Sequence, residues 1–503
     1  ADINTYLTDF KIPDTFPKPI TMANLMTHTP GFEDRSTGLF ARKVEELQPL
    51  EEYLAKNMPA RVFPPGEVTA YSNYGAALAG YIVEKVSGMP FEDYIEENIY
   101  KPLEMQKSTF RQLLPSELTP NMAKGYTYED GVFKAEEFEY LTSSPDGSMS
   151  TTATDIAKFM IAHLNDGFYK DKRILQENTA KEMHSQQFRN DPRVNGMCYG
   201  FYEQNLNNQR IIAHGGDTLY FHSLLALLPE QKVGLFVSFN SADTMLQNAT
   251  SSARDELFQA FLDRYYPMPH LLEPKSLENS QKYVKDFTGY YLVTRSSYTT
   301  YEKIADLFLG PILLFRATKD GHLLIASRQF VEVEPLVFYE VGGQEKIVVH
   351  EDSKGTYAFL NGAPIAAFIK LSWYQTPIFH YILPGFSLIL FLSTIAWIVS
   401  ALRNRKKGKK VEPHSRWARC VAGWMSILYL IFLICMLIIL KNAYDVIYGI
   451  PPLLPFALVL PLIAIIPTIG SIYFTVLAWK NSYWSMLGRV HYTLVTLASL
   501  VFI

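Results

Sequence analysis

The chain has 503 residues, of which 48% are hydrophobic, 19% charged and 14% aromatic, with 3 cysteines and a formal net charge of -4. At about 100–200 residues per domain, this length predicts more than one domain with ample material for a core. The apolar content excludes a disordered or collagen-like chain, the few cysteines exclude a disulfide scaffold, and the charge argues against a nucleic-acid partner.

The charge is unevenly distributed along the chain. From Leu371 to the end there are 11 basic and 2 acidic residues, a formal charge of +9, whereas the preceding part holds 35 basic and 48 acidic residues, a formal charge of -13. The small net charge of the whole chain therefore combines two parts of opposite charge, which we expect to have different surroundings.

Residues 1–268 mix helical and strand patterns, which predicts an α+β domain with an antiparallel sheet flanked by helices. Apolar spacing predicts helices near 47–57, 74–87, 91–99, 154–165 and 249–265, and the fourth follows a capping-box pattern of Thr152 and Asp155. Strands are predicted over 210–214, 223–228 and 233–239. The last two form a hairpin, because Pro229 and Glu230 begin a short turn between them.

A linker at 269–282 and a small all-β domain at 283–371 are expected next. Alternating apolar residues predict its strands at 312–317, 322–326, 330–339, 346–350 and 356–360. The domain shows no catalytic constellation, so we expect a spacer or a wall on the substrate side.

Residues 372–503 carry apolar stretches at 378–402, 417–440 and 453–479, each long enough to cross a hydrocarbon core about 30 Å thick. A fourth run, from Val490 to Ile503, is too short to span, and we expect the sequence to stop within a helix. Buried helices of a soluble domain are the alternative, but such helices rarely lack a charged face over this length. A transporter would need ionisable groups inside the spans, which these stretches almost entirely lack.

Basic residues predict the orientation of these spans. The loop between the first two carries Arg403, Arg405, Lys406, Lys407, Lys409, Lys410 and Arg416, and Arg419 lies at the start of the second span. Because such residues stay on the cytoplasmic side, everything before Ile378 is expected to be extracytoplasmic.

Generic catalytic motifs are missing from the sequence. It contains no GxSxG, HExxH, GxxxxGK[ST] or GxGxxG pattern, and no Cys/His cluster with zinc spacing, so neither a metal nor a cofactor is expected. Two short sites remain, Tyr71-Ser72-Asn73 and His214-Gly215-Gly216-Asp217. Neither is specific alone, because most of the 31 tyrosines pack in cores and a histidine at a strand end is usually structural.

In combination with their surroundings, these sites resemble serine β-lactamase-like proteins of the class C and penicillin-binding type. Leu25-Met26-Thr27-His28-Thr29-Pro30-Gly31-Phe32 is similar to that family's Leu-Leu-Thr-His-Thr-Ser-Gly-Leu segment. Tyr71-Ser72-Asn73 matches its Tyr-x-Asn motif, Asp146–Phe159 its Gly-Ser-Thr-Asp-Leu segment, and His214-Gly215-Gly216 its Lys/His-x-Gly motif. Four segments in order, over roughly residues 1–265, imply a β-lactamase-like fold.

One family motif does not occur. The Ser-x-x-Lys that carries the nucleophile is found nowhere in the chain, and Ala1–Leu7 resembles the stretch that follows it. We therefore expect a fragment whose catalytic serine and lysine lie upstream of residue 1, and the lack of a signal peptide carries no weight.

The resemblance implies a serine that attacks a carbonyl and forms an acyl-enzyme. Tyr71 would relay its proton, which requires nearby cations because a tyrosine pKa is ordinarily near 10. His214, if protonated, would be one such cation and would make the site pH-sensitive. Asn73 would hold the lysine and the substrate, Gly215 and Gly216 would allow close approach of the substrate, and the Asp217 N–H would belong to the oxyanion hole. His28 is expected to support its loop by hydrogen bonding, and Ser72 to contact the substrate or the lysine rather than to act as the nucleophile. His163 and His222 are expected to be structural or on the surface.

The sequence thus predicts a membrane-anchored, extracytoplasmic serine hydrolase acting on an amide or peptide, β-lactam or ester. A D-peptide or cell-wall peptidase is favoured, because a multi-span anchor suits a substrate produced at the membrane. The expected partners are a small peptide or β-lactam-like substrate and the lipid bilayer. The alternative is a catalytically inactive sensor or binding protein that keeps the pocket without the nucleophile, and the upstream sequence would distinguish the two.

Overall fold

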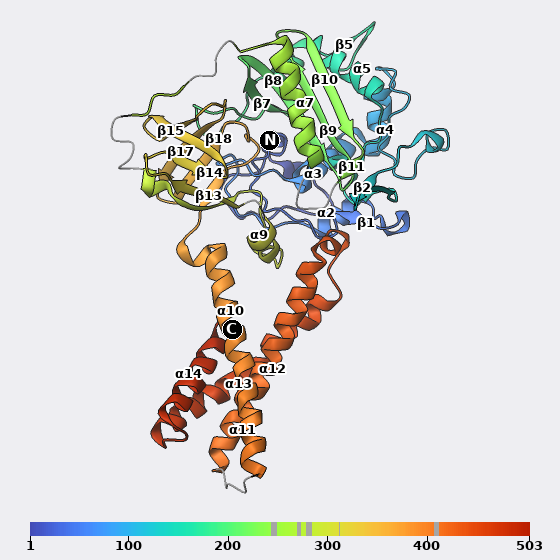
Figure 1. Cartoon of the computed structure of the whole chain (residues 1–503). Coiled ribbons are helices and arrows are strands. Elements are labelled where there is room, and N and C mark those ends of the chain that lie inside the picture. Colours follow the sequence, from blue (N-terminus) through green and yellow to red (C-terminus); the bar gives the residue numbers. More distant parts are fainter. Residues whose placement is uncertain (243–248, 269–272, 278–283, 311, 407–411, 503) are drawn as a thin grey trace. The chain divides into compact units, whose positions relative to one another are not determined.

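The computed structural model describes residues 1–242, 249–268, 273–277, 284–310, 312–406 and 412–502. Its contacts divide the chain into two units, Ala1–Lys370 and Leu371–Ile503. The first holds an α/β part and a closed barrel, and the second is helical (Figure 1). Much of the predicted linker, and the predicted loop residues Lys407, Lys409 and Lys410, lie outside the described residues.

A four-stranded antiparallel sheet with the order β10-β9-β8-β7 forms the centre of the α/β part. Its strands are β7 (Tyr202–Leu206), β8 (Gln209–Asp217), β9 (His222–Leu228) and β10 (Val233–Phe239). The predicted β9–β10 hairpin is confirmed, and Val233 pairs with Leu228. Strand β7 was not predicted, because this edge strand buries few side chains and shows no apolar alternation.

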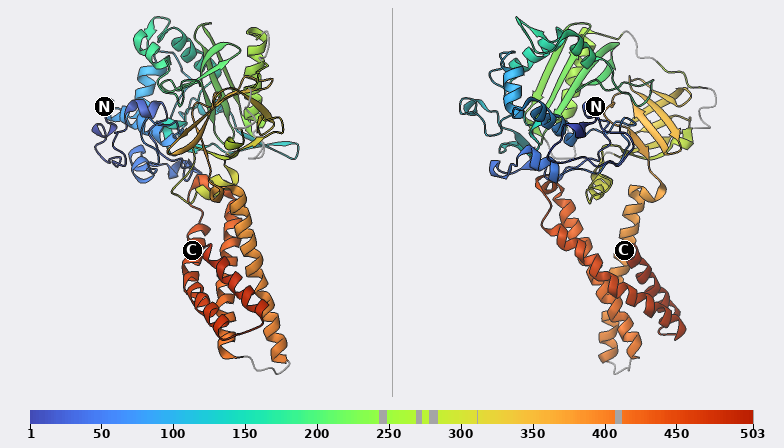
Figure 2. Two further views of the ribbon diagram at one scale, coloured as in Figure 1. Left: turned by 90° about the vertical axis from the view of Figure 1, so that its left-hand side faces the viewer. Right: turned by 180° about the vertical axis from the view of Figure 1, so that it is seen from behind.

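Helices cover both faces of this sheet, which confirms the predicted layer fold (Figures 1 and 2). On one face, Phe258 and Leu262 of α7 (Ala249–Tyr265) pack against a cluster that includes Ile211 and Leu224. On the other, α5 (Ala153–Leu164) packs against a cluster that includes Ile212 and Leu227. Neighbouring residues of one strand therefore join opposite clusters, as the two-residue period of a strand requires.

The start of α5 differs from its predicted capping box. Thr152 Oγ1 accepts the Asp155 N–H at 3.3 Å, as expected for an N-cap. The Asp155 carboxylate instead accepts the Lys107 N–H at 2.7 Å and the Ser108 hydroxyl at 3.0 Å. This carboxylate fastens a distant loop to the helix, which a local pattern cannot reveal.

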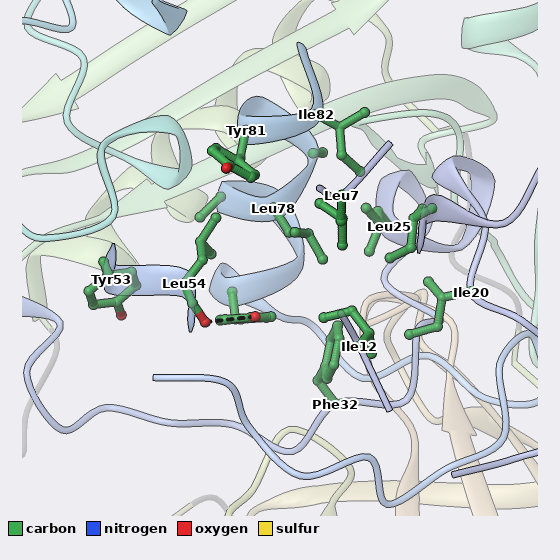
Figure 3. Packing of buried hydrophobic residues seen from close by; sticks show 14 residues of the cluster. Leu7, Ile12, Ile20, Leu25, Phe32, Tyr53, Leu54, Leu78, Tyr81 and Ile82 are labelled. Carbon is green, nitrogen blue, oxygen red and sulfur yellow. Dashed lines mark hydrogen bonds between the residues drawn. The ribbon is translucent and has the colours of Figure 1, made fainter. Parts of the chain in front are cut away.

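A helical layer packs around α3 (Asn73–Ser87), and Figure 3 shows its core. Leu25 of α1 (Met22–Met26), Leu54 of α2 (Leu50–Lys56) and Leu78 of α3 meet there, and the Tyr74 hydroxyl donates to the Leu54 carbonyl at 3.0 Å. The helix predicted at 91–99 is α4 (Phe91–Ile95) continued by a π-helical turn. The remaining elements of the α/β part are β1 (Phe40–Ala41), β2 (Tyr126–Glu129), β3 (Val132–Ala135), β4 (Tyr140–Leu141), β5 (Phe168–Tyr169), β6 (Lys172–Arg173), α6 (Glu177–His184) and β11 (Ser241–Ala242).

The barrel closes because its first strand pairs with its last. Its strands are β12 (Gly289–Val293), β13 (Ile312–Ala317), β14 (Leu323–Ile325), β15 (Arg328–Glu334), β16 (Val337–Glu340), β17 (Lys346–Asp352), β18 (Gly355–Leu360) and β19 (Phe368–Lys370). The single strand predicted at 330–339 is wrong, because the chain reverses between β15 and β16 at Leu336, whose φ is 65°. Valine and glutamate alternate up to Glu334, and apolar residues begin again at Pro335, so the alternating pattern runs into the turn and hides it. Strands β12 and β19 and helix α9 (Lys303–Leu309) were not predicted either.

The second unit consists of α10 (Pro377–Ser393), α11 (Ile395–Lys406), α12 (Pro413–Lys441), α13 (Leu453–Lys480) and α14 (Met486–Leu500). Three segments, at 377–403, 413–441 and 453–480, are helical, long and apolar enough to cross a membrane. Phe391 of α10, Tyr429 of α12 and Tyr492 of α14 lie in one hydrophobic core of this unit. The Tyr492 hydroxyl donates to the Ala418 carbonyl at 3.0 Å.

Candidate active site

The Tyr-x-Asn motif lies at the start of α3. Ser72 is the N-cap, and its Oγ accepts the Gly75 N–H at 3.0 Å, so its hydroxyl serves the helix. Tyr71 immediately precedes this cap, and its N–H donates to the Ile365 carbonyl of the barrel at 3.1 Å. The motif is therefore held by the helix on one side and by the barrel on the other.

His28 supports this motif from the Thr-His-Thr segment, as the sequence predicted. Its carbonyl accepts the Ala70 N–H at 2.8 Å, and its Nδ1 accepts the Ser72 N–H at 3.2 Å. Burial lowers the pKa of His28 to about 3, so the imidazole is neutral near pH 7 and its Nδ1 lone pair is available. The backbone of His28 is left-handed, with φ 52°, which directs the ring and the carbonyl at the same short segment.

The third motif ends strand β8 beyond its pairing with β7. The last residue of β8 that β7 pairs with is Ala213, so His214–Asp217 is paired by β9 alone among the described strands. A Cβ on Gly215 would lie 3.6 Å from the Tyr202 hydroxyl, and one on Gly216 would lie 3.9 Å from Ser223, both ordinary contacts. Internal packing therefore does not require glycine here, whereas close approach of a ligand would.

Asp217 closes this strand with a charged network. Its carboxylate contacts His222 Nδ1 at 2.7 Å and Arg254 Nη1 at 3.0 Å. Burial pulls the pKa of Asp217 upward, but these two partners outweigh it, and the pKa lies below its usual range. His222 is 8% exposed and has the structural role predicted for it.

The sequence-predicted site residues meet in one cavity of about 1860 Å³. Its lining includes all six of them: Tyr71, Asn73, His214, Gly215, Gly216 and Asp217. The ring centres of Tyr71 and His214 are 6.0 Å apart. Tertiary structure thus joins two motifs that lie far apart in the sequence.

His214 does not supply the positive charge expected of it at neutral pH. Burial lowers the pKa of its imidazole, and a contact of 2.6 Å between Nδ1 and the Gly215 carbonyl offsets this only in part. The neutral form is therefore favoured near pH 7. With Nδ1 as the donor in that contact, Nε2 is left as a proton acceptor.

Arg295 brings a positive charge to Tyr71 instead. Its Cζ lies 4.6 Å from the centre of the Tyr71 ring, and its Nε donates to Asp34 Oδ2 at 3.1 Å. Burial raises the pKa of Tyr71, and Arg295 opposes that rise. Sequence reasoning missed Arg295, because it follows strand β12 of the barrel and no local motif surrounds it.

Asp146 is a second cavity residue, which the sequence placed in a family segment without assigning it a role in the site. Its Oδ2 accepts the Ser143 hydroxyl at 2.8 Å, whereas its buried Oδ1 has no hydrogen-bond partner within the described part of the chain. Burial raises the pKa of Asp146 to about 7, so this carboxyl is partly protonated near neutral pH.

Comparison with known proteins defines the family. A family profile described as Beta-lactamase matches residues 1–257, which is half of the chain. The chain belongs to the β-lactamase family of serine hydrolases, which includes penicillin-binding proteins and D-amino acid amidases. The predicted family and fold class are confirmed.

Individual relatives are distant. Penicillin-binding protein 4* of Bacillus subtilis is 23% identical over 366 residues, 65% of this chain and 78% of that protein. Beta-lactamase-like protein 4 of Dictyostelium discoideum is 26% identical over 52% of this chain and 48% of its own. Among solved structures, the octameric penicillin-binding protein homologue from Pyrococcus abyssi is 19% identical, with a TM-score of 0.44 and coverage of 74% and 82% of the two chains. The D-amino acid amidase from Ochrobactrum anthropi SV3 is 23% identical, with a TM-score of 0.40 and coverage of 50% and 72%.

Proposed function

We propose that the protein is a serine hydrolase that cleaves an amide or peptide, β-lactam or ester through an acyl-enzyme, with D-peptides or cell-wall peptides as favoured substrates. The observation that carries the proposal is the convergence of Tyr71, Asn73 and residues 214–217 on one cavity. An extended peptide can approach the edge of β8 there, because β7 does not pair with β8 beyond Ala213.

Each residue has a role in this proposal. Tyr71, acting as its phenolate, takes the proton of the serine hydroxyl as the serine oxygen attacks the carbonyl, and returns that proton to the leaving group as the acyl-enzyme forms. Asn73 orients the lysine and the substrate amide. The backbone N–H of Asp217 stabilises the oxyanion, and His214 lies next to the relay.

The nucleophilic serine and its lysine are not assigned to residues of this sequence. Ser72 caps α3, and no Ser-x-x-Lys occurs in the chain. The cavity of about 1860 Å³ is larger than the roughly 300–1,000 Å³ typical of small-ligand pockets. Apolar side chains such as Ile156, Leu225 and Phe236 contribute to its walls.

Covalent labelling of the full-length protein tests this function. The full-length natural protein should gain the mass of a fluorophosphonate or penicillin probe, and Tyr71→Phe should lower turnover at least about 100-fold without unfolding the protein. Tyr100→Phe is the matched control. Tyr100 does not line the cavity, and its buried hydroxyl has no hydrogen-bond partner among the described residues. A full-length protein that acquires no adduct and hydrolyses no amide or ester would refute the enzyme and favour the inactive binding protein.

We also propose that the apolar helices anchor the protein in the cell membrane with residues 1–370 extracytoplasmic. The basic residues between the first two apolar helices support this orientation. In a variant without native cysteines, a cysteine at Asn442 should react with an impermeant maleimide on intact cells, whereas one at Asn481 should react only after lysis. The reverse pattern would contradict the orientation.

A further inference from the structure

We propose that Arg295 is a positioning residue for Tyr71, so that the barrel completes the catalytic centre rather than only lining it. Arg295 would hold the Tyr71 ring in place and keep a permanent positive charge beside the hydroxyl that relays the proton. This inference deepens the proposed function and rests on it.

The Tyr71 ring has two close planar neighbours. The His28 ring is stacked on it with a centre-to-centre distance of 4.0 Å and an angle of 29°, and the Arg295 Cζ lies 4.6 Å from the ring centre. Groups this close to one ring centre could not both fit on the same face, so they take opposite faces. Tyr71 is thereby clamped between a neutral imidazole and a guanidinium, and cation–π attraction contributes to the second contact.

The other charged groups around Tyr71 leave Arg295 as its favourable electrostatic neighbour. Asp34, Asp146 and Asp217 each oppose ionisation of Tyr71. Burial keeps His28 neutral and favours the neutral form of His214. Asp34 is itself paired with Arg295 and Asp217 with Arg254, so their charges are partly neutralised.

Burial opposes the charge of Arg295 as well, but Asp34 and Tyr71 outweigh this effect and raise the guanidinium pKa. Arg295 therefore stays charged throughout the proton relay. The proton itself moves only between the serine oxygen, Tyr71 and the leaving group.

Backbone contacts on both sides of Arg295 determine its position. Thr294 Oγ1 donates to the Thr69 carbonyl at 2.6 Å and accepts the Ala367 N–H at 2.9 Å. On the other side, the Ser296 carbonyl accepts the Asp34 N–H at 3.0 Å. The barrel thus bonds to the segments that carry Tyr71 and Asp34, which places Arg295 between them.

The experiment compares Arg295→Met and Arg295→Lys in the full-length enzyme, with Arg328→Met as the matched control. Arg328 is another barrel arginine paired with a carboxylate, Glu340, and it does not line the cavity. We expect Arg295→Met to lower kcat at least about 10-fold at neutral pH, to move the acidic limb of the pH profile to higher pH and to leave KM nearly unchanged. Arg295→Lys should recover part of the loss, and Arg328→Met should behave as the wild type.

Chemical rescue separates charge from packing. Guanidinium ions at non-denaturing concentration should restore turnover to Arg295→Ala, whereas urea, which has a similar shape and no charge, should not. An Arg295→Met enzyme with the wild-type pH profile would overturn the proposal. So would an equal loss at every pH that guanidinium does not rescue, because a merely structural role predicts that result.

A measurement without turnover keeps this inference distinct from the proposed function. In protein labelled with ¹³C at tyrosine Cζ, the Tyr71 signal is the one lost in Tyr71→Phe. Its titration should move to higher pH in Arg295→Met and stay in place in Arg328→Met. If the Tyr71 titration does not move in Arg295→Met, the role of Arg295 is overturned even if the enzyme is active. If that titration moves but the protein never hydrolyses substrate or binds a probe, only the proposed function is refuted.

Discussion

Replacing Glu33 should loosen the barrel segment that carries Arg295. Glu33 is 2% exposed, and its carboxylate accepts the backbone N–H groups of Tyr298 at 2.6 Å and Thr299 at 2.7 Å, together with the Thr299 hydroxyl. Glu33→Ala removes all three acceptor contacts at once. Glu33→Gln keeps the shape and one acceptor oxygen but removes the charge.

The expected magnitudes follow from these contacts. A hydrogen bond to a charged group contributes about 1.5–3 kcal/mol. Thr299 is exposed, so water replaces its hydroxyl contact and part of its N–H contact, which leaves a loss of about 3 kcal/mol for Glu33→Ala. Glu33→Gln should cost about 1 kcal/mol, because charge-assisted bonds are roughly twice as strong as neutral ones.

Hydrogen exchange followed by mass spectrometry measures this loosening in the intact chain. The reporter is the peptide that holds Asp34 and Thr37, whose N–H groups donate to Ser296 and Glu302 across the same junction. Since each 1.4 kcal/mol is about a factor of ten, exchange should accelerate about 100-fold in Glu33→Ala and about 5-fold in Glu33→Gln. Glu97→Ala is the control, because the exposed Glu97–Lys101 pair contributes less than about 0.5 kcal/mol.

If exchange at this peptide in Glu33→Ala matched that in Glu97→Ala, the reasoning would fail. The barrel would then be held by other contacts, and Glu33 would not be a fastening point.

Two further predictions concern the cavity and its support. Gly31→Ala should lower the unfolding temperature far more than Gly38→Ala. Both positions have left-handed φ values, 84° and 74°. A Cβ at Gly31 would lie 1.8 Å from the Phe63 carbonyl oxygen, whereas a Cβ at Gly38 would meet nothing within 4 Å. The left-handed conformation alone costs about 1–2 kcal/mol, so equal effects of the two substitutions in thermal unfolding would show that the clash is relieved without cost. Asp146→Asn should weaken the dependence of stability on pH between about 4 and 7, because the folded carboxyl, with its pKa raised to about 7, keeps a proton that the unfolded one has lost. The contribution of Asp146 to native stability therefore falls as pH rises through that window, and Asp146→Asn should be more stable than the wild type at pH 8. If the free energy of unfolding of the wild type and of the variant changed with pH in parallel, the raised pKa of Asp146 would be contradicted.

Much of the fold could be predicted from the sequence, because periodic burial leaves a local record. The hairpin of β9 and β10, the helices α3 and α5 and the three long apolar helices all follow from the spacing of apolar residues. The errors lie where this record is weak or misleading. β7 is an edge strand that buries little, and the alternation of valine and glutamate in β15 runs directly into apolar residues at the turn before β16.

For the site, the sequence by itself determined the motifs, since Tyr71-Ser72-Asn73 and His214-Gly215-Gly216 are short runs that a local turn and a strand end can carry intact. Only the tertiary structure decided which charge faces the relay tyrosine. His214, the cation expected from its motif, is held neutral by burial, and Arg295 reaches Tyr71 from the barrel. Charge and burial depend on neighbours brought together from distant parts of the chain, and such neighbours leave no pattern in the local sequence.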